Sequence, residues 1–68
     1  MIGSHIQKYR LEKKMSQADL GKMVNIDQTL ISRIERNKRK VFADELPKFA
    51  EALGVSPDDL LKKKEVTR

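Results

Sequence analysis

The sequence contains no cysteine, and its single histidine, His5, has no partner at the spacing of a metal site. Disulfides, thiolate metal sites and zinc fingers are therefore excluded. The three glycines lie too far apart to form a phosphate-binding loop. No apolar run approaches the roughly 18 residues of a membrane helix, and the first residues lack the continuous apolar segment of a secretory signal. We therefore expect a soluble, intracellular protein with no cofactor, metal or small-molecule ligand.

Size and charge narrow the function further. The chain has 68 residues and a net charge of +5. A chain this short forms one domain that buries only about 60% of its unfolded surface, which leaves no room for an enclosed active site, so we do not expect an enzyme. The positive charge favours an anionic partner, either nucleic acid or an acidic membrane surface. Membrane binding is the weaker option, because the apolar residues are used within short helices rather than left exposed beside a basic face.

The most informative segment runs from Ser16 to Arg36 and is typical of two short helices joined by a tight turn. Ser16 is followed three residues later by Asp19, the usual arrangement at a helix start, so the first helix is expected to begin near Gln17. Asn25 tolerates the left-handed backbone and is expected to end it. The buried face of this helix should consist of Leu20, Met23 and Val24.

The second helix of this segment carries two distinct faces. Asp27 is its expected cap and Asn37 its expected end. Its apolar stripe comprises Ile26, Leu30, Ile31 and Ile34. Its exposed groups are Gln28, Thr29, Ser32, Arg33 and Arg36. These side chains can donate hydrogen bonds to base edges or accept hydrogen bonds from them, and no acidic residue lies among them. The alternative is a solvated polar face without any chemical role, as in many small helical proteins.

A basic loop follows this helix. Lys38, Arg39 and Lys40 come soon after Arg33 and Arg36. A loop that leaves a helix inserted in the major groove passes near the sugar-phosphate backbone, where lysine and arginine gain from counterion release. The alternative is a solvated loop that only aids solubility.

Periodicity and caps predict the remaining helices. The first should run from about Ser4 to Lys13, with Ser4 as its cap and His5 solvated beside its apolar stripe. The fourth should start near Asp44 or Glu45 and end at Gly54. Its apolar residues are Phe42, Leu46, Phe49, Ala50 and Leu53. A fifth helix, capped by Ser56 and Asp59, carries Leu60 and Leu61.

Three segments carry a resemblance to a known family. They are IGSHIQKYRLEKKMSQADLGKMV, ISRIERNKRK and FAEALGVSPDDLL, in that order. Over residues 2–61 the chain resembles the Cro/C1-type, or XRE-type, helix-turn-helix domains of bacterial and phage repressors. The resemblance implies an all-α, compact five-helix bundle of the lambda-repressor-like type, in which helices 2 and 3 form the motif and helix 3 enters the major groove. Residues 1–61 are then the DNA-binding domain, and residues 62–68 a basic tail that we expect to be solvated.

The same resemblance implies residue roles. Gln28 and Thr29 match the leading base-contacting positions, Arg33 matches a later one, and Ser32 is a weaker candidate. Gln17 matches a glutamine that meets a phosphate at the start of helix 2 and can brace Gln28. The other expected phosphate contacts are Arg36, Lys38, Arg39 and Lys40. Arg10 and Glu35 match an ion pair that links helix 1 to helix 3.

Three positions depart from the family pattern. Asn25 and Asn37 stand where glycine is usual, and Gly21 stands where alanine is usual. Glycine inside a helix costs about 0.5 to 1 kcal/mol relative to alanine, unless it allows the two helices of the motif to approach closely.

These observations predict a sequence-specific, double-stranded DNA-binding repressor or controller. We expect a cytoplasmic homodimer, bacterial or phage-encoded, on a pseudo-palindromic operator and associated with the nucleoid when bound. Family analogy places the dimer surface at Val55, Pro57, Leu60 and Leu61, although burial in the core explains them equally well. The alternatives are an antitoxin or the N-terminal DNA-binding part of a larger regulator, and a helical protein-interaction module without DNA specificity.

Overall fold

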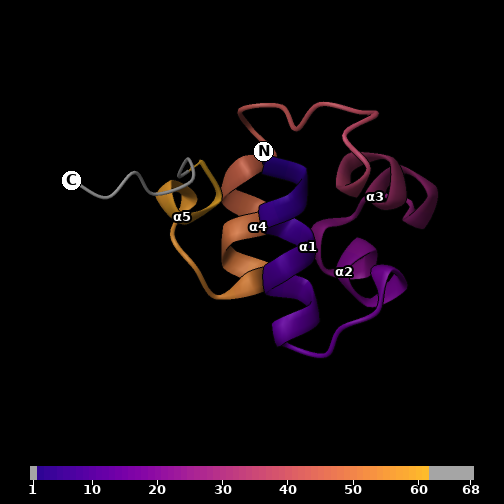
Figure 1. The fold of residues 1–68 in the computed structure, drawn as a ribbon, viewed down its shortest axis with the longest axis horizontal. Coiled ribbons are helices and arrows are strands. Elements are labelled where there is room, and N and C mark those ends of the chain that lie inside the picture. The colour runs from indigo at the N-terminus through magenta and orange to yellow at the C-terminus, as the bar shows by residue number, and fades with distance from the viewer. Residues whose placement is uncertain (1, 62–68) are drawn as a thin grey trace.

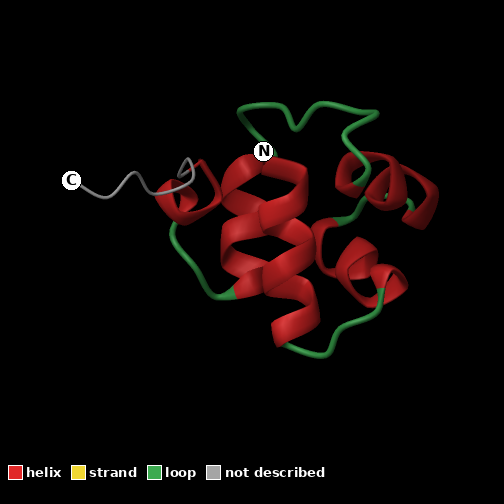
Figure 2. Cartoon of the chain, in the orientation of Figure 1, coloured by secondary structure: helices red, strands yellow, loops and turns green. Residues whose placement is uncertain are grey.

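The computed structural model describes residues 2–61, and the basic tail predicted for residues 62–68 lies outside them. These described residues form five helices, α1 (Ile2–Glu12), α2 (Gln17–Val24), α3 (Gln28–Glu35), α4 (Leu46–Leu53) and α5 (Pro57–Leu61). No strand occurs among the described residues (Figure 2). Helices α1 and α4 form the centre of the molecule, with α2 and α3 to one side and α5 to the other (Figure 1). The predicted all-α five-helix bundle is confirmed.

One hydrophobic core joins all five helices. Its buried side chains are Ile6, Leu20, Val24, Ile31, Ile34, Phe49, Ala50, Ala52, Leu53 and Leu60. Helices α2, α3 and α4 have only 8 residues each, which is too short for an isolated helix to be stable in water. They are therefore held by packing on this shared core, of which Phe49 is a fully buried member.

The predicted helix ends of the α2–α3 pair are confirmed. The Ser16 hydroxyl accepts a hydrogen bond from the Asp19 backbone N–H at 2.9 Å, and the Ser16 N–H donates to the Asp19 carboxylate at 3.1 Å. The hydrogen bond from the Ser16 N–H to this carboxylate lowers the pKa of Asp19. Asp27 caps α3, and Asn25 and Asn37 adopt left-handed backbone with φ of 60° and 64°. Asparagine therefore serves at both turns where glycine is usual in the family.

Two expectations about α1 were wrong. The helix begins at Ile2, so Ser4 lies inside it rather than at its cap. His5 is half-buried rather than solvated, and its Nδ1 lies 2.8 Å from the carbonyl oxygen of Leu60. This hydrogen bond joins α1 to α5, whose residues lie too far along the chain for local periodicity to indicate the contact.

Three expected core residues lie at the surface or at its edge. Met23 is 58% exposed, because Leu20 and Val24 already fill the inner face of α2. Phe42 is 56% exposed and precedes α4, which starts at Leu46, slightly later than predicted. Leu30 is half-buried and is not one of the buried core residues. In each case helical spacing predicted a buried position that the packing of the helices leaves partly or largely exposed.

The structure shows why glycine fits at position 21. A Cβ atom on Gly21 would lie 2.5 Å from the carbonyl oxygen of Ile26 and 3.6 Å from Ile31 Cγ1. The two helices of the motif therefore approach each other closely at this point, and the close approach offsets the cost of a glycine inside α2.

Gly3 makes a second close approach and gives a test of the packing. A Cβ atom on Gly3 would overlap the carbonyl oxygen of Ile34 at the end of α3. Gly3→Ala is therefore expected to lower the free energy of unfolding by about 1 kcal/mol, although alanine favours helix in general. Urea unfolding followed by circular dichroism measures the change. Gln7→Ala, at an exposed position one turn later, should leave stability unchanged, and a Gly3→Ala variant as stable as that control would contradict the prediction.

Candidate nucleic-acid interface

Helix α3 presents a polar face to solvent. Thr29, Arg33 and Arg36 are exposed at a spacing of three and four residues, so they share one side of the helix. Ser32 beside them is half-buried, and Gln28 is exposed at the first position of the helix. Full burial of the isoleucines on the opposite side fixes which face points outward. The structure therefore brings all the predicted base-contacting residues onto this one helix, with Ser32 the least accessible.

A buried ion pair holds α3 against α1. Arg10 Nε lies 2.6 Å from Glu35 Oε2, and Arg10 Nη2 lies 2.9 Å from Glu35 Oε1. Arg10 Nη1 also donates to the carbonyl oxygen of Met15 at 2.8 Å. The two side chains are only 8% and 1% exposed. The expected pair is thus present, and its many hydrogen bonds offset the cost of burying two charges.

Gln17 has a different partner from the one expected. Its Nε2 donates to Glu35 Oε1 at 3.0 Å, so it joins the buried ion pair rather than bracing Gln28. This contact was missed because it joins residues on two helices that only the folded chain brings together. The buried Glu35 carboxylate therefore fixes the orientation of the Gln17 side-chain amide at the N-terminus of α2.

The basic loop contains two kinds of cation. Lys38 and Lys40 are exposed, whereas Arg39 is half-buried. Arg39 donates from Nη1 to Glu45 Oε1 at 3.1 Å and from Nη2 to Glu45 Oε2 at 3.0 Å. These hydrogen bonds lower the pKa of Glu45 and raise that of Arg39, each relative to its ordinary value. Arg39 therefore differs from the two lysines, although sequence alone grouped the three as phosphate contacts.

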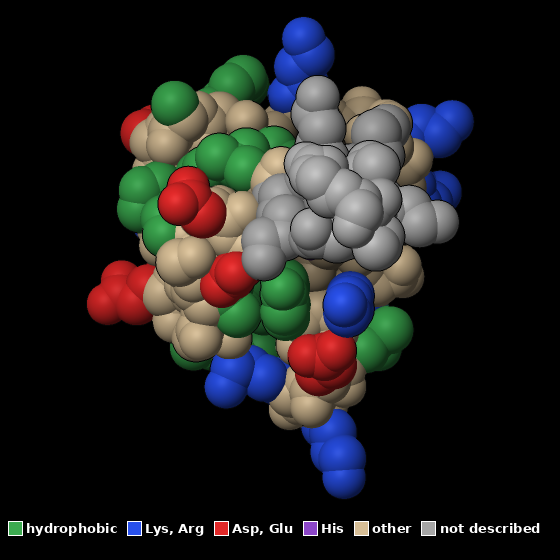
Figure 3. Space-filling model, turned by 60° about the vertical axis from the view of Figure 1, so that its left-hand side comes forward, with side chains coloured by type: hydrophobic (Ala, Val, Ile, Leu, Met, Phe, Trp, Pro, Cys, Tyr) green, Lys and Arg blue, Asp and Glu red, His purple; other side chains and the backbone are tan. Residues whose placement is uncertain are grey.

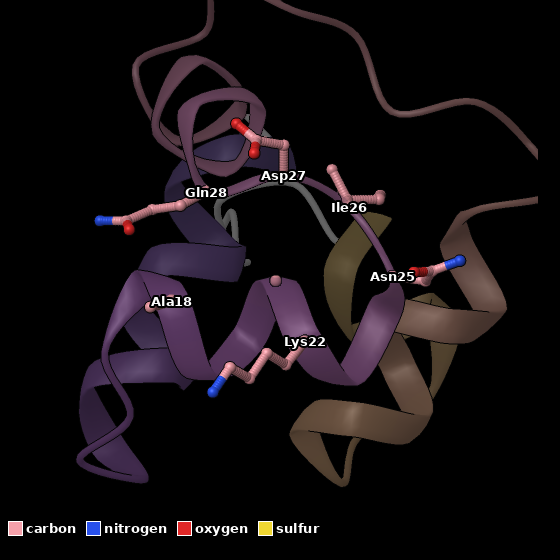
Figure 4. A pocket seen from close by; sticks show the side chains of 7 residues that line it. Ala18, Lys22, Asn25, Ile26, Asp27 and Gln28 are labelled. Carbon is pink, nitrogen blue, oxygen red and sulfur yellow. The ribbon is translucent and has the colours of Figure 1, made fainter.

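An open hollow of about 430 Å³ lies where α2 turns into α3. It is lined by Ala18, Gly21, Lys22, Asn25, Ile26, Asp27 and Gln28. Figure 4 shows the Gln28 amide and the Lys22 ammonium on the same side of this hollow, with Asn25 pointing away. Its one carboxylate, that of Asp27, caps α3. The hollow thus borders the first residue of the polar α3 face.

Among residues 2–61, no group of three or more histidine, cysteine, aspartate or glutamate side chains could hold a metal ion. None of the helices in this described range is long and apolar enough to cross a membrane.

The expected dimer surface is only partly accessible. Leu60 is fully buried, so its inclusion in that surface was wrong: it packs in the core of its own chain. Leu61 is 49% exposed, Pro57 is exposed, and Val55 is half-buried against the core. Figure 3 turns the α5 side of the molecule forward and shows hydrophobic side chains on this face among acidic and basic ones.

Comparison with known proteins identifies the family. The family profile described as helix-turn-helix matches residues 6–60. The chain belongs to this helix-turn-helix family. The control protein C.BamHI from Bacillus amyloliquefaciens is 42% identical over 62 residues, which cover 90% of this chain and 76% of that protein. The repressor protein C2 of Salmonella phage P22 is 39% identical over 62 residues, which cover 91% of this chain but only 29% of the repressor.

Solved structures of proteins bound to DNA match the fold over nearly the same range. The P22 c2 repressor in complex with a synthetic operator has a TM-score of 0.85 at 39% identity, covering 91% of this chain and 94% of that one. SinR, a master regulator for biofilm formation solved in complex with DNA, has a TM-score of 0.85 at 35% identity and covers 91% and 100% of the two chains. The helix-turn-helix motif of this chain is the α2–α3 pair.

Proposed function

We propose that this helix-turn-helix protein is a sequence-specific, double-stranded DNA-binding transcriptional regulator, a repressor or controller that acts by occupying an operator rather than by catalysis. The observation that carries the proposal is the exposed polar face of α3, free of acidic residues and held by the buried pair of Arg10 and Glu35. The similarity to a control protein and to a repressor solved on its operator supports it. Such a regulator works in the cytoplasm of a bacterial cell, at the nucleoid when bound.

In this proposal α3 lies in the major groove. Gln28 hydrogen-bonds to adenine, Thr29 contacts the neighbouring base, and Arg33 donates to O6 and N7 of a guanine. Ser32 contributes less, because it is half-buried. Phosphates are contacted by Arg36, Lys38, Lys40 and the N-terminus of α2 at Gln17, and these contacts set the register of the helix.

The active form is a homodimer. One domain of this size contacts only a few base pairs, so useful specificity requires two domains on half-sites about 34 to 36 Å apart. The exposed residues Pro57 and Leu61, together with half-buried Val55, remain the proposed pairing surface.

Selection from a random duplex library with the purified protein, repeated at two salt concentrations, tests this function. A symmetric enriched site is expected, and it would give the operator and the stoichiometry together. The double variant Gln28→Ala/Thr29→Ala should keep its helical circular dichroism and lose the enrichment. Steep salt dependence without an enriched site would instead indicate nonspecific DNA binding, and weak binding at low salt would indicate a protein-interaction module.

A second candidate is that this domain is the DNA-binding part of a longer regulator, or an antitoxin that depends on a partner. The small share of the P22 C2 repressor that the chain matches, 29%, favours this alternative. A stable dimer at micromolar concentration in analytical ultracentrifugation would contradict dependence on a missing partner.

A further inference from the structure

The loop between α3 and α4 is closed by a compact set of contacts centred on Arg39 and Glu45. The two hydrogen bonds between their side chains form a bidentate ion pair, and the side chains are 21% and 14% exposed. Arg39 Nη1 also donates to the carbonyl oxygen of Lys40 at 3.1 Å. Glu45 Oε1 accepts the backbone N–H of Phe42 at 3.0 Å. Together these contacts tie the middle of the loop to the residue that precedes α4.

Two further contacts complete this arrangement. The Arg39 guanidinium lies 5.1 Å from the centre of the Phe42 ring, which covers one side of it. At the start of the loop, the Lys38 N–H donates to the carbonyl oxygen of Arg33 at 2.7 Å, and Asn37 is in the left-handed conformation. The loop is therefore fixed at its start by the end of α3 and at its end by Glu45.

Lys38 and Lys40 flank Arg39 and are exposed. Their ammonium groups are available to an anion, whereas both outer nitrogens of Arg39 are engaged with Glu45. The division of roles follows from these bonds: the lysines provide charge to a partner, and the arginine shapes the loop that carries them.

We propose that Arg39 and Glu45 are positioning residues that hold this loop in the conformation in which Lys38 and Lys40 meet DNA phosphates. The proposal rests on the DNA-binding function proposed above. It assigns to an acidic side chain a favourable effect on DNA affinity, and it removes Arg39 from the phosphate contacts.

Glu45 has two opposing effects on the affinity for DNA. A carboxylate near DNA repels phosphates, so simple electrostatics predicts that removing it strengthens binding. A loop that loses its ion pair must instead be ordered when DNA binds, and each long side chain that becomes immobilised weakens the complex. Because the Glu45 charge is already neutralised by Arg39 at contact distance, the ordering effect is the larger of the two.

The test compares Glu45→Gln with Asp44→Asn. Both variants remove one negative charge, but Asp44 is exposed and, in the described part of the chain, makes no hydrogen bond like those of Glu45. Glu45→Gln is expected to bind the selected operator about tenfold more weakly than the wild type, the size expected when two lysine side chains must be ordered on binding. It should also show a smaller slope of log K against log salt, because in part of the complexes the loop stays disordered and Lys38 and Lys40 do not contact phosphates. Asp44→Asn should bind as well as the wild type or slightly more tightly, with an unchanged slope.

A loss of global stability would not reduce the salt slope at a temperature where both variants are folded, and thermal unfolding followed by circular dichroism establishes that temperature. Arg39→Lys provides a second arm: it keeps the charge but loses the bidentate geometry, so it should weaken binding as Glu45→Gln does. Equal affinities and slopes for Glu45→Gln and Asp44→Asn, or full affinity in Arg39→Lys, would overturn the proposal.

Measurements on the free protein separate this inference from the function on which it rests. Amide ¹⁵N relaxation should show residues 38–42 becoming mobile in Glu45→Gln and not in Asp44→Asn. If the wild type fails to bind any duplex, the proposed function is wrong, yet the relaxation data still decide whether the ion pair orders the loop. An equally rigid loop in both variants would show that it does not.

Discussion

Replacing Glu35 with alanine is expected to lower the free energy of unfolding by about 3 to 5 kcal/mol, because it leaves the buried guanidinium of Arg10 without its counter-charge. Gln17 loses its hydrogen-bond acceptor at the same time. Small domains have only about 0.05 to 0.15 kcal/mol of stability per residue, so the expected loss is comparable with the whole stability of this one. Thermal and urea unfolding followed by circular dichroism should show a largely unfolded protein at 37 °C.

A double variant separates the buried charge from the packing. Arg10→Met/Glu35→Leu removes both charges and introduces apolar side chains of comparable volume, so most of the lost stability should return. An exposed ion pair contributes less than about 1 kcal/mol to the free energy of unfolding. A loss no larger than this in Glu35→Ala would show that the buried pair is not needed for folding. Because unfolding also abolishes DNA binding, each affinity measured on these variants has to be compared with the folded fraction at the same temperature.

The caps of α2, α3 and α5 were the part of the fold that the sequence predicted best. Ser16 with Asp19, and Ser56 with Asp59, form the reciprocal hydrogen bonds expected of them. Such bonds join residues three positions apart, so their geometry depends only on the local backbone. The same reasoning explains the left-handed turn at Asn25, since its conformation is a local property of the chain.

Contacts between distant residues were predicted only where the family resemblance supplied them. Arg10 with Glu35 was expected on that ground, whereas the Gln17 contact to Glu35 was not. The pairing of Arg39 with Glu45 was also missed, because a run of three basic residues suggests equal roles until the folded loop brings one of them against an acid. The exposure of Met23 likewise depends on how α2 packs against the other helices, and the sequence of α2 alone does not determine that packing.

These contacts explain how the candidate interface obtains its orientation. The core fixes which side of α3 is buried, and the ion pair with Arg10 fixes the end of the helix against α1. The polar face then has one orientation relative to the basic loop that follows it. A surface prepared in this way loses less conformational entropy on binding than one that must be assembled on the DNA.

Arg33→Ala is expected to lower the discrimination at one base pair of the operator by about 1 to 3 kcal/mol, because the proposed bidentate hydrogen bonds to guanine are lost. Arg33 is exposed on the outer face of α3, so the substitution should leave the stability of the domain unchanged. The measurement is the affinity for the selected operator and for the three single-base variants at the contacted position. The wild-type protein should bind the selected operator more tightly than the three single-base variants, and Arg33→Ala should bind all four sequences with similar affinity.

Lys38→Ala is the matched control, since it also removes one exposed positive charge but lies in the loop beyond α3. It should weaken binding to all sequences by a similar factor and reduce the slope of log K against log salt by about 1, because a phosphate contact carries no sequence information. The reverse pattern, with uniform weakening in Arg33→Ala and lost discrimination in Lys38→Ala, would reject the assignment of Arg33 to a base. It would then place the base contacts in the loop, contrary to the orientation that the buried face of α3 gives the helix.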